Sequence, residues 1–243
     1  MVKDGKEVAP VITVVGNFTK PTKDKPSLLS MDETETFFHE FGHALDGLFS
    51  EKSYPTSYVA RDFVELPSQI MEHWAFHPEM LAIYAKHYET GEKMPDELVE
   101  KIRKSKYFNQ GFANVEYLAA AMLDMAYHTA EDVENLDVEQ FEKDYFAKTG
   151  LIPEIISRYR STYFAHIIGG YDAGYYSYIW SAVLDHDAFD AFNENGVFDK
   201  ATARLFRTKV LERNGIVDPL QMYIDFRGRE AVIEPLLRNR GLN

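Results

Sequence analysis

The 243-residue sequence contains no cysteine. This absence excludes disulfide bonds, a thiolate nucleophile and a cysteine-ligated metal ion. Any metal must therefore be held by histidine, aspartate and glutamate side chains. Because a chain without cysteine is compatible with reducing and with oxidising compartments, the periplasm stays open as an alternative to the cytoplasmic location that we expect.

Positive charge and long apolar runs are also scarce. The chain has 26 Lys and Arg against 39 Asp and Glu, a net charge of −13, and no basic stripe of the kind that binds phosphate backbones. No apolar run approaches the roughly 20 residues of a membrane-spanning helix, and the opening residues, MVKDGKEVAP, do not form a signal peptide. We therefore expect a soluble protein that binds neither nucleic acid nor membranes.

The apolar pattern predicts a mainly α fold. Residues 8–20 are β-branched and apolar, end in a Gly-Asn turn, and predict a strand. Nearly everything after the Pro- and Lys-rich loop that follows has the apolar spacing of helices. We expect a small β element near the N-terminus, and no break in composition divides residues 1–243 into two domains.

Three stretches give the clearest helix predictions. Residues 31–50 open with Asp32 as N-cap and Glu35 three residues later, a capping-box arrangement. A second helix runs from about Asp62 to residue 76, with Pro67 tolerated near its first turn. Apolar residues also recur at helical spacing in residues 115–125 and 176–192.

The segment FFHEFGH, residues 37–43, places His39 and His43 four positions apart, with Glu40 beside the first. Histidines at i and i+4 lie on one helix face, so both imidazoles can bind one ion. Glu40 would lie beside the open coordination position, where it could take a proton from a metal-bound water. An H-E-x-x-H match alone is equally compatible with polar residues of a helix surface or of a hydrogen-bonded core.

Two nearby features favour the metal site. Gly42 inside a helix costs about 1 kcal/mol relative to alanine, which indicates the close approach of another element. Glu65 follows on the next predicted helix and completes the two-histidine, one-glutamate set of a catalytic zinc site. Other carboxylates could orient a ligand imidazole, although a solvated or capping role is the alternative for each: Glu35, Asp62 and Glu72.

Six of the 15 tyrosines fall within residues 159–178. On a helix, Tyr171, Tyr175 and Tyr178 would share one face. An aromatic core helix is the alternative, but each buried phenol would then need a hydrogen-bond partner. Two glycines directly before these tyrosines would allow a loop to bend near a ligand: Gly169 and Gly170.

Four segments carry a resemblance that covers nearly the whole chain: FFHEFGHALDGLFS, ARDFVELPSQIMEHW, RYRSTYFAHIIGGYDAGYYSYIW and FRGREAVIEPLLRNRGLN. In this order they resemble the thimet oligopeptidase family of zinc metallopeptidases, and most closely its bacterial peptidyl-dipeptidase (dipeptidyl carboxypeptidase) branch. The resemblance implies a single zincin-type catalytic domain over residues 1–243. It also implies one Zn²⁺ per chain, held by His39, His43 and Glu65, with Glu40 as the base.

The implied activity is hydrolysis of short oligopeptides by Glu-assisted attack of a zinc-bound water, with release of C-terminal dipeptides. Endo-oligopeptidase cleavage is the alternative within the family. The resemblance also places His166, Tyr171, Tyr175 and Tyr178 around the scissile peptide, where O–H or N–H donors stabilise the charge on the carbonyl oxygen. We expect Tyr175, Tyr178 and His166 to be catalytic, and Tyr171 with the glycine pair to bind substrate.

The chain departs from the family pattern in three respects. Asp46 stands where many members have histidine, and the loop of residues 51–63 is shorter than usual and lacks a Ser-Gly-Thr turn. Family members are much longer, so the N-terminal helical portion that forms the other wall of their substrate channel is missing. We therefore expect an excised catalytic region or a fragment, with oligopeptides and that missing portion as partners. A zinc-bound but inactive peptide-binding fragment is the alternative.

Overall fold

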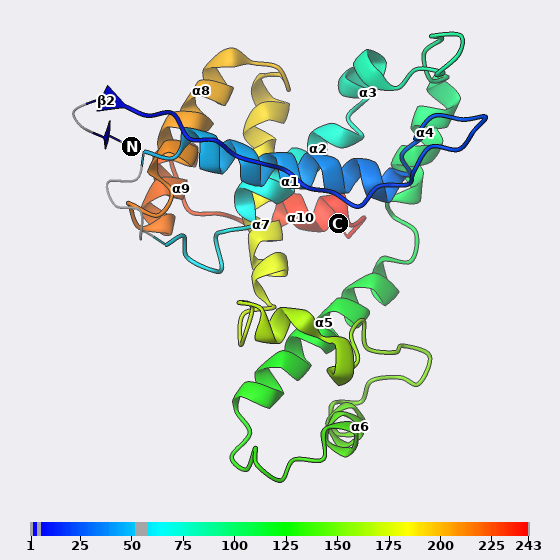
Figure 1. Ribbon diagram of the computed structural model, residues 1–243, viewed down its shortest axis with the longest axis vertical. Helices are drawn as coiled ribbons and strands as arrows, with labels where there is room; N and C mark the ends of the chain where they lie inside the picture. Colours follow the sequence, from blue (N-terminus) through cyan, green and yellow to red (C-terminus); the bar gives the residue numbers. More distant parts are fainter. Residues whose placement is uncertain (1, 4–5, 52–57, 243) are drawn as a thin grey trace. The chain divides into compact units, whose positions relative to one another are not determined.

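The computed structural model describes residues 2–3, 6–51 and 58–242, most of them in helices (Figure 1). The mainly α class predicted from the sequence is confirmed. The chain divides into two compact units, residues 1–106 with 181–243 (unit 1) and residues 107–180 (unit 2). The prediction that residues 1–243 act as one catalytic domain stays a prediction.

Unit 1 contains a short hairpin and several helices: β1 (Val2–Lys3), β2 (Lys6–Glu7), α1 (Met31–Phe49), α2 (Leu66–Ala75), α3 (Pro78–Tyr84), α4 (Asp96–Ser105), α8 (Lys200–Lys209), η3 (Leu211–Arg213), α9 (Pro219–Arg227) and α10 (Glu234–Asn239). Unit 2 contains α5 (Gln110–His128), α6 (Val138–Thr149), η1 (Ser161–Tyr163) and η2 (Ala165–Ile168), and α7 (Ser177–Asn195) begins in it and ends in unit 1. None of the helices described has the length and apolar character that a bilayer span requires.

The core of unit 1 forms around α2. Leu66, Ile70 and Trp74 recur every four residues and present one buried face of this helix. They pack with residues of α7 and α9, among them Phe192 and Met222. Burying an aliphatic or aromatic side chain contributes roughly 1.5–3 kcal/mol, so this face holds α2 firmly in the unit.

Helix α1 meets α2 at Gly42. A Cβ atom at this position would lie 2.2 Å from the carbonyl oxygen of Pro67 and 2.6 Å from Cα of Ser68. The close approach predicted at Gly42 is therefore confirmed, and its partner is the main chain in the first turn of α2 (Figure 1, α1 in blue and α2 in cyan). Because main-chain atoms cannot swing aside as a side-chain end can, only glycine allows the two helices to touch here.

The capping box predicted at Asp32 and Glu35 is wrong. Ser30 is the N-cap of α1: its hydroxyl accepts a hydrogen bond from the Glu33 N–H at 3.1 Å, and the Glu33 carboxylate accepts one from the Ser30 N–H at 2.8 Å. The Glu33 carboxylate also accepts hydrogen bonds from the N–H and hydroxyl of Thr19, at 2.6 and 2.7 Å. Ser30 and Glu33 themselves match the Ser-x-x-Glu capping-box pattern, and the contact with Thr19 favours this earlier start over the one at Asp32.

The strand predicted over residues 8–20 is wrong, because the segment has no strand partner among the described residues. It is an extended chain that runs along α1 in the opposite direction (Figure 1). The side chain of Ile12 lies against Gly47, where an added Cβ atom would be 2.9 Å from Cδ1 of Ile12. The ring of Phe18 lies 6.4 Å from that of Phe37. A β-branched sequence favours extended backbone, but only a neighbouring strand supplies the ladder of hydrogen bonds.

The only sheet pairing in the described part of this region joins β1 and β2, which are antiparallel and two residues long each. The predicted small β element is therefore not confirmed in the form expected. The second predicted helix is formed, but it begins at Leu66, because turns occupy the residues after Asp62. Pro67 stands in its first turn, as predicted, where it removes no helical hydrogen bond.

Gly42→Ala should lower the free energy of unfolding by about 1–3 kcal/mol, because the added methyl group overlaps main-chain atoms of α2. Gly111→Ala in α5 is the matched control, since a Cβ there meets no atom within 4 Å. Its better helix propensity should stabilise the chain by about 0.5–1 kcal/mol. Urea unfolding followed by circular dichroism measures both variants, and equal effects would contradict the contact at Gly42.

Candidate functional site

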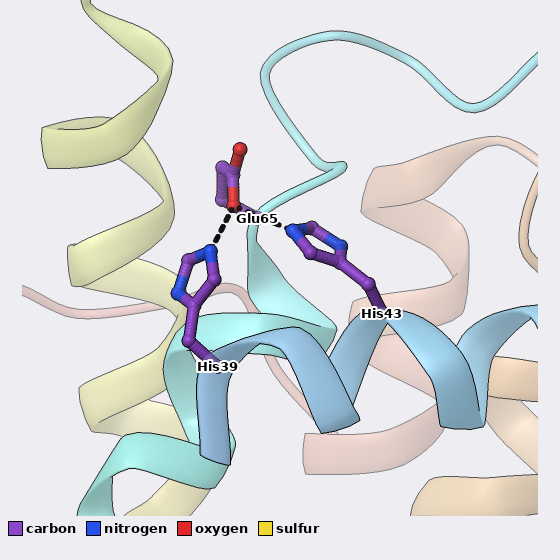
Figure 2. A group of neighbouring side chains, drawn as sticks. All are labelled: His39, His43 and Glu65. Atoms are coloured by element: carbon purple, nitrogen blue, oxygen red, sulfur yellow. Dashed lines mark ion pairs between the residues drawn. The ribbon is translucent and has the colours of Figure 1, made fainter. Parts of the chain in front are cut away.

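The candidate metal site lies in unit 1, between the middle of α1 and the residue before α2. Nε2 of His39 and Nε2 of His43 each lie 3.3 Å from the same oxygen, Oε2, of Glu65. Figure 2 shows both imidazoles extending from α1 toward this oxygen. The two rings are nearly perpendicular, with centroids 5.0 Å apart, so they approach one point from different directions. The structure thus brings together the three ligands that the sequence predicts.

Glu65 is the most buried member of this group, with 1% of its surface exposed. It directly precedes α2, whose N-terminus carries a partial positive charge that favours a carboxylate. The hydroxyl of Ser68 donates a hydrogen bond to Oε2 at 2.7 Å. Since a buried carboxylate is costly without such partners, these contacts compensate its burial and keep it pointed at α1.

Glu72 supports His39 on the other side of its ring. Its Oε1 lies 2.6 Å from Nδ1 of His39, which leaves Nε2 for a metal ion. Burial alone would lower the pKa of His39, but the hydrogen bonds and charges of Glu65 and Glu72 outweigh it and raise the pKa to about 10. For Glu72 burial acts in the other direction and raises the pKa to about 7, although the hydrogen bond and the charge of His39 act to lower it. Glu72 is therefore in the supporting position that the sequence predicts.

Glu35 and Asp62 were expected to support the ligands in the same way. Glu35 is half-buried on α1, and burial raises its pKa, although Lys106 and His39 act in the opposite direction through their charges. The main-chain carbonyl of Asp62 accepts a hydrogen bond from Ser181 Oγ at 3.3 Å. For both carboxylates, direct support of a ligand imidazole stays a prediction.

Glu40, the predicted base, follows His39 in α1 and is half-buried. One residue corresponds to a rotation of about 100° around the helix axis. Its side chain therefore leaves α1 beside the face that carries His39 and His43, next to the candidate ligands and not among them. Its catalytic role stays a prediction.

Unit 1 also contains a second His/Asp cluster, which no local sequence pattern predicts, because His73 is 112 residues from Asp185. His73 Nε2 and His186 Nδ1 lie 2.6 and 2.7 Å from Oδ1 of the buried Asp185. Burial would raise the pKa of Asp185, but the two histidines outweigh it and lower the pKa. His186 Nδ1 also donates to the carbonyl of Ala182 at 2.7 Å, so this nitrogen has no lone pair left for a metal ion. We interpret the cluster as buried hydrogen bonds that join α2 to α7.

The aromatic tract forms a cluster within unit 2. The ring of His166 lies 5.9, 5.1 and 6.2 Å from the rings of Tyr171, Tyr175 and Tyr178. Tyr171 and Tyr178 stack with centroids 5.2 Å apart. The helix predicted over residues 176–192 is confirmed as α7, which begins at Ser177, so Tyr171 and Tyr175 lie in the turns before it and the three tyrosines do not share a helix face. The turns nevertheless bring the predicted side chains together.

The clustered side chains differ in burial. Tyr175 is 3% exposed and packs against Tyr159, and burial raises the pKa of its hydroxyl. Tyr171, Tyr178 and His166 are half-buried. A half-buried side chain can meet a peptide without rearrangement of unit 2, whereas Tyr175 lies inside the cluster.

The glycine pair before Tyr171 forms the bend that the sequence predicts. Gly170 has a φ of +105°, which residues with a side chain rarely adopt. A Cβ at Gly169 would lie 2.9 Å from the carbonyl oxygen of Ala165. Contact of this bend with a substrate stays a prediction.

Two of the departures from the family pattern concern Asp46 and the loop of residues 51–63, and the structure describes only the first in full. Oδ1 of Asp46 accepts a hydrogen bond from Nδ2 of Asn214 at 2.8 Å, so this carboxylate ties the last turn of α1 to the segment after η3. Residues 52–57 of the shortened loop lie outside the described residues.

A cavity of about 900 Å³ lies against another face of α1. Its lining is mainly apolar and includes Leu45, Phe49 and Trp74. On a helix with about 100° per residue, Leu45 and Phe49 lie well away from the face of His39 and His43. The cavity reaches Gly42 and Pro67 at the contact of α1 with α2, but none of the three candidate ligands lines it.

Residues 2–242 match the family model for Peptidase family M3. The chain is 46% identical over 240 residues to dipeptidyl carboxypeptidase from Escherichia coli, covering 96% of this chain and 35% of that protein. It is 40% identical over 258 residues to organellar oligopeptidase A, chloroplastic/mitochondrial, from Arabidopsis thaliana, covering 100% of this chain and 32% of that protein. It is 35% identical over 245 residues to oligopeptidase A from Haemophilus influenzae, covering 98% of this chain and 36% of that protein. The chain thus spans about a third of the length of these relatives.

Proposed function

Because this chain belongs to peptidase family M3, a family of metallopeptidases, we propose that residues 1–243 carry the zinc site of a zincin-type peptidase. Its reaction is hydrolysis of peptide bonds in short oligopeptides, with release of C-terminal dipeptides. The name of the Escherichia coli relative, dipeptidyl carboxypeptidase, supports the dipeptide product. The names of the other two relatives support oligopeptides as substrates.

One observation carries the proposal: two imidazole nitrogens converge on one carboxylate oxygen of Glu65 at 3.3 Å each. Charge-assisted N–H···O hydrogen bonds are usually shorter, about 2.7–2.9 Å. In a tetrahedral zinc site with bonds of about 2.0–2.2 Å, neighbouring ligand atoms lie about 3.3–3.5 Å apart. The spacing of His39, His43 and Glu65 therefore fits three ligands of one small ion. Two histidines and one glutamate are also a known donor set of catalytic zinc.

Each nearby residue then has a defined task in hydrolysis. Zinc, when bound, supplies a Lewis acid that polarises the reacting groups. Glu40 accepts the proton of the attacking water and returns it to the leaving amine. Glu72 fixes the orientation of the His39 ring through Nδ1, and Ser68 does the same for the Glu65 carboxylate.

We assign the stabilisation of the carbonyl oxygen to the aromatic cluster of unit 2. Negative charge develops on this oxygen as water adds, and positioned O–H or N–H donors stabilise it. Tyr175, Tyr178 and His166 were all expected to donate to this oxygen. Because Tyr175 is buried and Tyr178 is half-buried, we favour Tyr178 as the donor, together with His166. Tyr171 and the glycine pair contact the substrate, and Tyr175 supports the cluster from within the unit.

Endo-oligopeptidase cleavage is a second candidate, because relatives named oligopeptidase A are 35–40% identical to the chain. Mass spectrometry of the products from one peptide, offered with a free and with an amidated C-terminus, separates the two reactions. Dipeptides released from the free acid alone support a dipeptidyl carboxypeptidase. Internal cleavage of both peptides supports an endo-oligopeptidase, and cleavage that survives a metal chelator contradicts the metallopeptidase.

A zinc-bound, inactive peptide-binding fragment is a third candidate, because the chain spans about a third of the length of its relatives. We propose that an N-terminal helical portion of a longer polypeptide supplies the other wall of the substrate channel. Substrate positioning provides a large part of the barrier reduction in enzymes. Zinc content without cleavage by residues 1–243, together with cleavage by the full-length polypeptide, would identify such a fragment.

The chain should bind one zinc ion, and His43→Ala should abolish tight binding, because only two of the three ligands remain. His87→Ala is the matched control, since this histidine is exposed on the loop after α3. Elemental analysis after dialysis measures the metal content of both variants. Full zinc occupancy in His43→Ala would show that this residue is not a ligand.

Glu40→Gln should keep the zinc ion and lose catalysis, because an amide cannot accept the proton of the attacking water. General bases typically contribute about 10²–10⁴-fold, so a loss of this size in kcat is expected. Glu79→Gln, at an exposed position of α3, controls for the change of charge. Steady-state kinetics and zinc analysis of the full-length polypeptide test this prediction, and unchanged turnover would remove Glu40 as the base.

Tyr178→Phe removes one hydroxyl and keeps the ring. If that hydroxyl donates to the developing negative charge, kcat should fall by about 10²–10³, while KM changes little. Tyr176→Phe is the control, because this ring is 39% exposed and is outside the cluster formed by His166 and its three tyrosines. The kinetics are measured on the full-length polypeptide. A raised KM with unchanged kcat would make Tyr178 a substrate-binding residue.

A further inference from the structure

Asp124 on α5 is a fully buried carboxylate that binds the turn after Tyr171. Its Oδ1 accepts a hydrogen bond from the main-chain N–H of Ala173 at 3.0 Å, and its Oδ2 accepts one from the N–H of Tyr175 at 2.9 Å. His128, one helical turn later, places Nδ1 2.9 Å from Oδ1. A buried charge persists only where such partners replace the lost water, so the carboxylate and the turn stabilise each other.

The turn requires this support, because Ala173 has a φ of +51°. A residue with a Cβ atom is disfavoured in this left-handed region, because its Cβ lies too close to the following carbonyl oxygen. Turns of this kind direct nearby N–H groups toward one anion. The Asp124 carboxylate therefore compensates for a backbone conformation that alanine itself disfavours.

Helix α5 holds the same turn at a second point. Tyr117, seven residues before Asp124 and on the same helix face, donates from its hydroxyl to the carbonyl of Tyr175. The Tyr117 hydroxyl also accepts a hydrogen bond from the N–H of Ile179 at 3.3 Å. Tyr175 is thus bound at its N–H and at its C=O, and the first turn of α7, which carries Tyr178, is attached to the same helix.

We propose that Asp124 is a positioning residue for catalysis. By fixing the turn at Ala173, it sets the directions in which the side chains of Tyr171 and Tyr178 leave the main chain. Its effect on catalysis rests on the proposed peptidase function, whereas its effect on the turn does not. A merely stabilising role would change the stability of unit 2 without a specific effect on these tyrosines.

Asp124→Asn tests the hold on the turn. The variant keeps the size of the side chain, but an NH₂ group cannot accept a hydrogen bond, so one of the two turn N–H groups loses its acceptor. Hydrogen-exchange mass spectrometry should show exchange at least about 10-fold faster in residues 169–178, with unchanged exchange in the middle of α5. Asp132→Asn, in the exposed loop after α5, is the matched control. Unchanged exchange in residues 169–178 would overturn the proposal.

Ala173→Gly provides a rescue, because glycine adopts a positive φ without a steric penalty. Added to Asp124→Asn, it should restore slow exchange in the turn and most of the lost turnover. In the protein with Asp124 intact, Ala173→Gly should change neither the exchange rate of the turn nor the turnover by much. A failure to rescue the exchange would show that Asp124 does not act through the conformation of Ala173.

Kinetics of the full-length polypeptide separate positioning from stability. Asp124→Asn should lower kcat by about 10²-fold, as a misplacement of about 1 Å can, with little change in KM. Tyr178→Phe should then cause a much smaller loss in the Asp124→Asn background than alone. A lower melting temperature with unchanged kcat would overturn the positioning role. If Tyr178→Phe alone leaves kcat unchanged, the proposed role of the tyrosines fails, and the exchange and rescue experiments still decide whether Asp124 holds the turn.

Discussion

The metal-site candidate depends on one steric constraint, the contact between Gly42 and the main chain at Pro67. His39 and His43 lie three residues before and one residue after Gly42, and Glu65 lies two residues before Pro67. The point where α1 and α2 touch is therefore also the point where the three candidate ligands converge. A side chain at Gly42 would have to push the helices apart by about 1 Å, several times the roughly 0.2 Å within which metal–ligand distances hold. The distances between the three candidate ligands therefore depend on a glycine at position 42.

Buried carboxylates fix the geometry in both units. In unit 1, Glu65 is held by the Ser68 hydroxyl and the two imidazoles, and in unit 2, Asp124 is held by two main-chain N–H groups. A buried charge tolerates few alternative arrangements, because each lost partner leaves a desolvated polar group behind. Asp187 follows the same rule at the contact of α7 with Arg229, whose guanidinium donates to both carboxylate oxygens. Such groups leave few alternative arrangements for the main chain that they bind.

The sequence predicted those features that depend on residues close to each other along the chain. The i, i+4 histidines, the apolar faces of the helices and the glycine at the helix contact all follow from local spacing. At the start of α1 two overlapping patterns allow a capping box, Ser30 with Glu33 and Asp32 with Glu35, and the contact of Glu33 with Thr19, fourteen residues earlier, favours the first. The predicted strand failed for a related reason, since strand pairing depends on a partner that the segment itself does not contain.

The turns around Tyr171 and Tyr175 show the same limit. Spacing alone shows only that these tyrosines would share a face on a helix, because the acceptor that stabilises the turn, Asp124, is 49 and 51 residues away from the two N–H groups that it binds. Asp185 and His73 are 112 residues apart. Buried polar contacts between distant residues leave no local pattern, so the sequence reveals the residue types of a site more readily than the groups that hold them.

The carboxylate of Glu33 belongs to two structural elements at once, the cap of α1 and the attachment of the extended segment through Thr19. Neither element has its full set of hydrogen bonds until the other is in place. We therefore expect the segment and the first turn of α1 to stabilise each other. Loss of the segment from the surface of α1 would loosen the start of the helix about two turns before His39, so the order of the helix that carries the candidate ligands also depends on residues remote from them.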